Sequence, residues 1–148
     1  SGLRLTGANL HGANLRRANL SDTRLEKADL INADLVEAEM GEANLREARL
    51  LGADLTRANL ADADLFGADL RRANLTESNL NGAELGEAKL AGADLTRAKL
   101  RGAILVGADL TKATLTGADC HPAQLSDAIL TDAIMPDGAP YQHPDRAK

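Results

Sequence analysis

An apolar residue stands at every fifth position of this chain from Leu5 to Met135. Of these 27 positions, 24 are Leu, and the others are Met40, Cys120 and Met135. From Ala8 to Ala133, Ala stands two residues before the apolar position in 24 of 26 units, the exceptions being Thr23 and Ser78, and Asp or Asn most often lies between. The repeating unit is therefore Ala-(Asp/Asn)-Leu-x-x.

A period of five fits neither regular secondary structure. On an α-helix five residues advance by about 500°, so the leucines would spiral around every side. On a straight strand an odd period sends successive leucines to opposite faces. A chain that turns once in each unit returns every Leu to the inside. Ala and Leu then share the inner face of a short extended segment, Asp or Asn points outward, and the two x residues form a corner.

Composition narrows the class of protein. The chain has 148 residues, with 26 Leu and 28 Ala but two aromatic residues, Phe66 and Tyr141, which indicates one packing arrangement repeated many times. A formal net charge of −5 argues against direct nucleic-acid binding through a basic field. A single Cys excludes an internal disulfide, and no apolar run is long enough to span a membrane. No signal peptide is recognised, which favours a cytoplasmic location.

The stretch of residues 53–75 reads ADLTRANLADADLFGADLRRANL and closely resembles the pentapeptide-repeat family, whose motif is A(D/N)Lxx. The resemblance implies an all-β, right-handed quadrilateral parallel β-helix, a solenoid of about seven 20-residue coils. The handedness comes from the family, because the period does not define it. Spacing alone leaves three or four sides open.

Residues 20 apart would stack in columns about 4.8 Å apart in a four-sided coil. One column reads Arg17, Glu37, Arg57, Glu77 and Arg97, and this alternation of sign favours four sides, because like charges in register repel. The column Gly12, Asn32, Gly52 and Gly92 predicts type II corners, which need a positive φ at the second corner residue. We expect another turn type in the charged column.

Few outward residues stand out as a candidate interaction surface. The acidic column Asp22, Glu42 and Asp62, with Glu39 nearby, is a run of one sign that could face a basic partner. Outward apolar residues are the stacked pair Ile31 and Leu51, together with Phe66, Ile104 and Val106 on one side.

The chain divides into Ser1–Gly2, interpreted as a tag remnant, a repeat over residues 3–138, and a flexible or capping tail over 139–148. The repeat begins without a capping helix, so either the chain comes from a longer protein or another molecule covers that end. At the other end, the apolar residues Ile129, Ile134 and Met135 leave two alternatives open. Either the tail folds back through Tyr141, or two copies associate end to end as a homodimer.

No constellation of residues supports catalysis, a cofactor or a metal site, so we expect no enzyme. Cys120 occupies an inward Leu position, away from His121, and the acidic residues lack the spacing of a calcium loop. A rod filled with Leu should also lack a cleft. The sequence favours a protein-interaction scaffold with an unknown protein partner. The alternative is a DNA mimic that binds a topoisomerase (gyrase), as the resemblance implies for the fluoroquinolone-resistance branch of the family.

Overall fold

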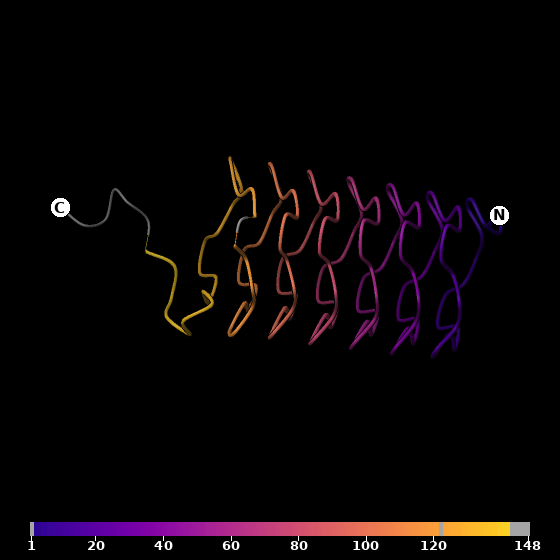
Figure 1. The fold of residues 1–148 in the computed structure, drawn as a ribbon, viewed down its shortest axis with the longest axis horizontal. Coiled ribbons are helices and arrows are strands. Elements are labelled where there is room, and N and C mark those ends of the chain that lie inside the picture. The colour runs from indigo at the N-terminus through magenta and orange to yellow at the C-terminus, as the bar shows by residue number, and fades with distance from the viewer. Residues whose placement is uncertain (1, 122, 143–148) are drawn as a thin grey trace.

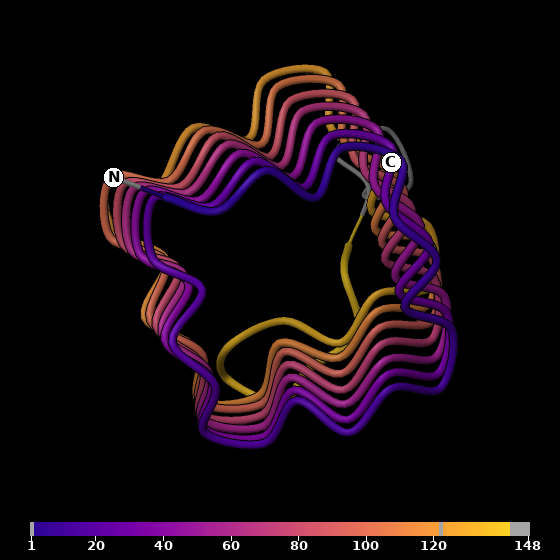
Figure 2. The same cartoon turned by 90° about the vertical axis from the view of Figure 1, so that its right-hand side faces the viewer.

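The computed structural model describes residues 2–121 and 123–142, which wind into a stack of coils (Figure 1). Viewed along the stack, each coil has four sides and four corners (Figure 2). The middle residue of each unit forms a single parallel bridge with the residue 20 positions later, as in Asp34 with Asp54 and Asp54 with Asn74. Parallel pairing at a spacing of 20 confirms the four-sided coil, and the described residues contain bridges and turns in place of long strands or helices.

Four ladders of bridges define the sides, which we name after their bridged residues. Side I runs from Arg4 to Gln124, side II from Asn9 to Ile129, side III from Asn14 to Ile134, and side IV from Asn19 to Asp119. Each side is followed by a corner of two residues, and we give each corner the numeral of the side before it.

Every backbone N–H in a typical unit has an acceptor. Asn74 N donates to the preceding coil (2.9 Å), whereas Leu75 N and Glu77 N donate to the following coil (2.7 and 2.9 Å). Ser78 N closes the corner by donating to Leu75 O (3.1 Å). The remaining donor, Thr76 N, binds the side-chain Oδ1 of Asn74 (3.1 Å). Asp and Asn therefore recur at the middle position because they satisfy a corner N–H that the ladder does not use.

The axis of the rod is filled by leucine and alanine. The residues at every fifth position from Leu25 to Leu115, Met40 included, are at most 2% exposed. Full burial of each Leu side chain contributes roughly 1.5–3 kcal/mol to stability. The two departures from Ala, Thr23 and Ser78, are also buried. The inward and outward positions are thus those that the period of five predicts.

The corners correct one expectation from the sequence. Gly12 and Asn32 have positive φ angles of 63° and 54°, as a type II corner requires, but Arg17 and Glu37 also have φ angles of 56° and 58°. The charged column therefore does not use a different turn at its second residue. A left-handed conformation costs a non-glycine residue about 1–2 kcal/mol. The hydrogen bonds between coils, and the bond that each Ala N–H donates to the Leu carbonyl three residues earlier, need the same geometry at every corner. Together they outweigh the cost of a positive φ at a non-glycine residue.

The two ends differ. At the N-terminal end Leu5, Leu10 and Leu15 are only partly buried, and Leu3 is 59% exposed. At the C-terminal end the chain turns back after Met135, and Tyr141 N donates to Ala133 O (2.8 Å) while its side chain packs against the core. Of the two alternatives for the tail, the fold-back is observed for residues up to 142; residues 143–148 lie outside the described part. In the described ranges, no helix reaches the length and apolar character that crossing a bilayer requires.

Candidate interaction surfaces

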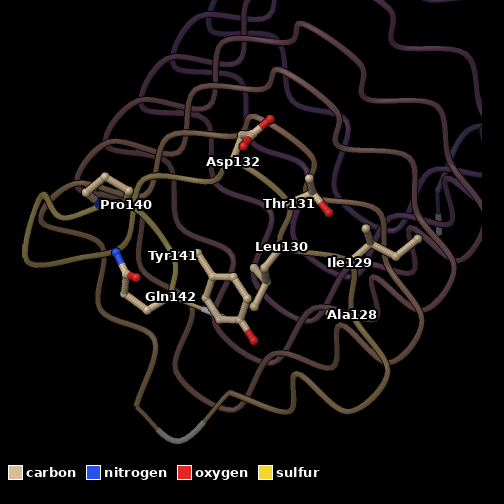
Figure 3. A pocket seen from close by; sticks show the side chains of 8 residues that line it. All are labelled: Ala128, Ile129, Leu130, Thr131, Asp132, Pro140, Tyr141 and Gln142. Carbon is tan, nitrogen blue, oxygen red and sulfur yellow. The ribbon is translucent and has the colours of Figure 1, made fainter. Parts of the chain in front are cut away.

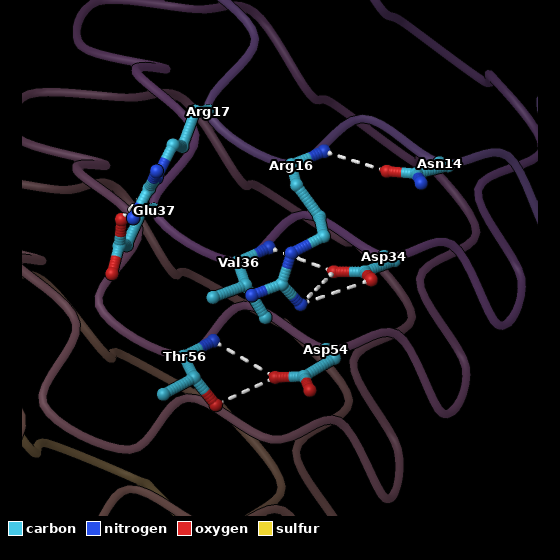
Figure 4. A network of polar contacts seen from close by, with 8 residues as sticks. All are labelled: Asn14, Arg16, Arg17, Asp34, Val36, Glu37, Asp54 and Thr56. Atoms are coloured by element: carbon cyan, nitrogen blue, oxygen red, sulfur yellow. Dashed lines mark hydrogen bonds and ion pairs between the residues drawn. The ribbon is translucent and has the colours of Figure 1, made fainter.

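A ladder of opposite charges runs along corner III. Arg17 Nε contacts Glu37 Oε2 at 2.6 Å, and Arg97 Nη1 contacts Glu77 Oε1 at 3.6 Å. Figure 4 shows the first of these pairs beside Asn14, Asp34 and Asp54, whose side chains accept bonds from corner residues. The hydrogen bond and charge of Arg17 lower the pKa of Glu37. The alternating column predicted from the sequence is confirmed, and within the column the charges balance except for one excess positive charge.

The acidic column lies on corner IV, where Asp22, Glu42 and Asp62 are all exposed. None of the three takes part in an ion pair with another residue of the described ranges. The column stops at Gly82, which carries no side chain, and the Asp62 carboxylate lies over this glycine. Glu39, on side IV, accepts a hydrogen bond from Asn59 Nδ2 (2.9 Å). The run of negative charge is thus restricted to the N-terminal half of one corner.

The outward apolar residues fall on different corners. Ile31 and Leu51 stack on corner II and are half-buried. Phe66 and Val106 belong to corner I, and Ile104 precedes that corner on side I. The structure therefore groups the last three residues and separates them from the first two.

Arg46 is a partner of Phe66 that the sequence reasoning missed. Its guanidinium carbon lies 4.6 Å from the centroid of the Phe66 ring, and its Nη1 contacts Asp64 Oδ2 at 3.0 Å. A cation above an aromatic face contributes about 0.5–1 kcal/mol at an exposed site. The spacing of 20 carried the signal, because it places Arg46 directly next to Phe66 in the corner column.

A groove of about 520 Å³ opens at the C-terminal end, where the returning tail crosses the last coil (Figure 3). Leu130, Tyr141 and the half-exposed Ile129 line it, whereas Ile134 and Met135 are not among the lining residues. The expectation of a rod without a cleft is thus wrong at this end. The cause is that the tail covers only one part of the open coil.

The chemically reactive side chains are dispersed. The Cys120 thiol is half-buried, and burial, together with the charge of Asp119, raises its pKa, so the nucleophilic thiolate is disfavoured. His11 Nδ1 lies 3.8 Å from Asp29 Oδ1 at the exposed N-terminal end. Among the described residues no three His, Cys, Asp or Glu side chains gather closely enough to hold a metal ion.

Comparison with known proteins agrees with this geometry. The family model described as pentapeptide repeats matches in eight copies, over residues 1–30, 23–61, 58–97 and 93–132. HetL, a pentapeptide-repeat protein involved in heterocyst differentiation regulation in the cyanobacterium Nostoc sp. strain PCC 7120, is similar at 35% identity and a TM-score of 0.60. That alignment covers 93% of this chain and 81% of HetL. No significant match was found among curated protein sequences.

QnrB1, a plasmid-mediated fluoroquinolone resistance protein, was compared as a trypsin-treated variant and gives a TM-score of 0.71 at 23% identity. The match covers 97% of this chain and 79% of that one. At this identity the likeness extends to the fold alone.

Proposed function

Because the chain belongs to the pentapeptide-repeat family, we propose that it is a non-catalytic scaffold that displays side chains for recognition by a partner protein. The observation that carries this proposal is the separation of inside from outside. Leu and Ala fill the axis, and the middle and corner residues, apart from the buried Val36 and Gly86, are held outward on a lattice that repeats every 20 residues. The clockwise course of the receding chain in Figure 2 supports the right-handed winding of the fold.

A rigid lattice favours recognition because little conformational entropy is lost on binding. In the unit 74–78 all five N–H groups are bonded, so the corners are ordered before a partner arrives. Preorganised surfaces convert more of their contact energy into affinity than mobile loops do. HetL is involved in the regulation of heterocyst differentiation, and such a role is consistent with a protein that acts through contacts.

Site-specific photo-crosslinking tests the proposal. A benzophenone amino acid is placed at one corner residue after each side, namely Val106, Thr111, Thr96 or Arg101, in cells that make the protein naturally. We expect a discrete protein adduct from at least one corner. Failure of all four folded variants to yield an adduct would contradict a scaffold role.

The alternative function is a DNA mimic that binds gyrase. A mimic needs a continuous negative stripe, whereas corner III alternates in sign and the acidic column of corner IV ends at Asp62. These features favour the scaffold. A supercoiling assay decides between them: purified protein that neither inhibits gyrase nor protects it from a fluoroquinolone removes the alternative.

A further inference from the structure

Side I and corner I carry an apolar strip in their C-terminal half. Phe66 and Val106 belong to the same corner column, two coils apart, and Ile104 lies next to Val106 on side I. Val106 is 38% exposed, which makes it one of the exposed large apolar side chains of the described residues. Strips of this kind on a rigid surface are candidates for protein contact.

Gly86 makes the strip continuous. It lies between Phe66 and Val106 in the column, and a Cβ atom there would be 3.0 Å from Phe66 Cδ2 and 3.7 Å from Val106 O. The Phe66 ring therefore leans across the coil that would otherwise separate the two apolar residues. Phe66, Gly86 and Val106 therefore form an apolar floor that spans three coils.

Carboxylates surround this floor. Glu84 and Glu87 lie on either side of Gly86 in the same coil, and both are exposed. The column neighbours of Glu87 are Gly67 and Gly107, so no basic side chain stands directly before or after it. Asp127, in the last coil of corner I, adds a further exposed carboxylate, and Asp62, on the adjacent corner IV, lies over Gly82, two residues before Glu84. In the part of the chain that the structure describes, none of the four carboxylates forms an ion pair.

The basic residues nearby are already engaged with other carboxylates. Arg46 pairs with Asp64 at 3.0 Å, and Arg101 pairs with Asp119 at 2.5 Å. Lys89 lies on side II, where its ladder neighbours are Asp69 and Asp109. Apart from the Arg46 guanidinium above Phe66, which is paired with Asp64, the apolar floor is therefore bordered by carboxylates that have no ion-pair partner among the described residues.

We infer that this acidic–apolar face, made of Phe66, Ile104 and Val106 with Asp62, Glu84, Glu87 and Asp127, binds an extended segment of a partner protein that combines basic and apolar side chains. The inference rests on the proposed scaffold function and adds the class of partner. Valine or leucine side chains of the segment pack on Phe66 and Val106, and its Lys or Arg side chains lie against Glu84 and Glu87.

Charge argues for a foreign segment rather than a second copy. The chain has a formal net charge of −5, so two copies repel one another at long range, whereas a basic segment is attracted. An extended basic segment also suits a floor that follows the corner column, because the side chains of an extended segment recur at regular intervals and can contact successive coils.

The test measures fluorescence anisotropy of a labelled synthetic peptide, Lys-Val-Arg-Leu-Lys-Val-Arg, titrated with the folded protein at about 50 mM salt. We expect the double variant Glu84→Gln/Glu87→Gln to weaken binding about tenfold or more and Val106→Ser to weaken it several-fold. The matched control Asp22→Asn/Glu42→Gln removes the same charge from corner IV and should leave the affinity within about twofold.

Four results would overturn the inference. The first is that the peptide does not bind the wild-type protein, and the second is that the corner IV control loses as much affinity as the Glu84→Gln/Glu87→Gln variant. The third is that a peptide with Gly in place of Val and Leu binds with the same affinity. The fourth is that sedimentation shows a dimer of the wild-type protein that Val106→Ser dissociates. The last result would identify a second copy as the occupant. If photo-crosslinking finds a partner on another side, the scaffold function stands and this face loses its role.

Discussion

Arg57 Nε donates a 2.8 Å hydrogen bond to Glu77 Oε2 across one coil step, and this bond, followed by the charge of Arg57, lowers the pKa of Glu77. The pair shows how a spacing of 20 in the sequence becomes a lateral contact. Because the carboxylate is exposed, its contribution is screened by salt.

Stability should fall in acid because of this pair. The folded-state pKa of Glu77 is below its ordinary value of 4.5, so the unfolded chain takes up the proton first as the pH decreases. The stabilisation is complete above the unfolded pKa and is lost as the pH falls through the folded pKa. We expect Glu77→Gln to reduce the decrease in Tm between about pH 5 and pH 3. Glu42→Gln, which removes a carboxylate without an ion pair in the described ranges, is the matched control for the lost charge.

Ser78→Ala should stabilise the protein. Ser78 Oγ is fully buried and has no hydrogen-bond partner among the described residues, whereas Ala occupies the equivalent position in most units. Removing an unsatisfied hydroxyl gains about 1 kcal/mol. Urea denaturation measures the change, with Ser126→Ala at an exposed corner as the control. A loss of stability in Ser78→Ala would show that the hydroxyl is satisfied.

Asn74→Ala should destabilise the protein by about 1 kcal/mol. Asn74 Oδ1 accepts bonds from Thr76 N (3.1 Å) and Thr76 Oγ1 (2.7 Å), and Ala leaves the corner N–H to solvent. Asn74→Asp keeps the acceptor and should be nearly neutral. Lys99→Ala, at a middle position whose side chain cannot accept such a bond, serves as the control in the same denaturation series. Equal losses in the Asn74→Ala and Lys99→Ala variants would mean that the side-chain bond adds nothing.

Leu65→Lys should prevent folding, since Leu65 is fully buried and an unpaired ammonium in that place costs several kcal/mol. Coupling between neighbouring coils spreads the effect along the stack. Thr76→Lys, at a partly exposed corner, should retain the wild-type circular dichroism and most of the stability. Similar behaviour of the two variants would reverse the assignment of inside and outside.

Tyr141→Ala should loosen the last coil. The Tyr141 side chain packs on the core and the groove at the C-terminal end, so truncation loses roughly 1–2 kcal/mol of local stability. Amide hydrogen exchange should quicken in residues 123–135 and stay unchanged around residue 65. Gln142→Ala, at the exposed neighbour, is the control. If exchange in residues 123–135 is as slow in Tyr141→Ala as in the wild-type protein, the tail does not stabilise this end.

The spacing of Leu65, Leu70 and Leu75 determined that the chain turns once in each unit, because a period of five leaves a regularly turning chain as the one way to bury every Leu. A four-sided coil, favoured by the alternating charges, then predicts that Arg57 lies beside Glu77. These features depend on local repetition, which a sequence displays directly. The family resemblance supplied the winding sense, which repetition cannot contain.

The tertiary structure decided the features that depend on how one coil meets the next. Arg17 adopts a positive φ because the ladder requires it, against its own preference. The spacing of 20 places Arg46 next to Phe66, but the lean of the Phe66 ring over Gly86 and the position of the Arg46 guanidinium above it are set by side-chain rotamers. Tyr141 returns to the core because the last coil has an open edge and no following coil to cover it. Contacts of this kind arise from packing in three dimensions, so the pattern of residues alone left them undetermined.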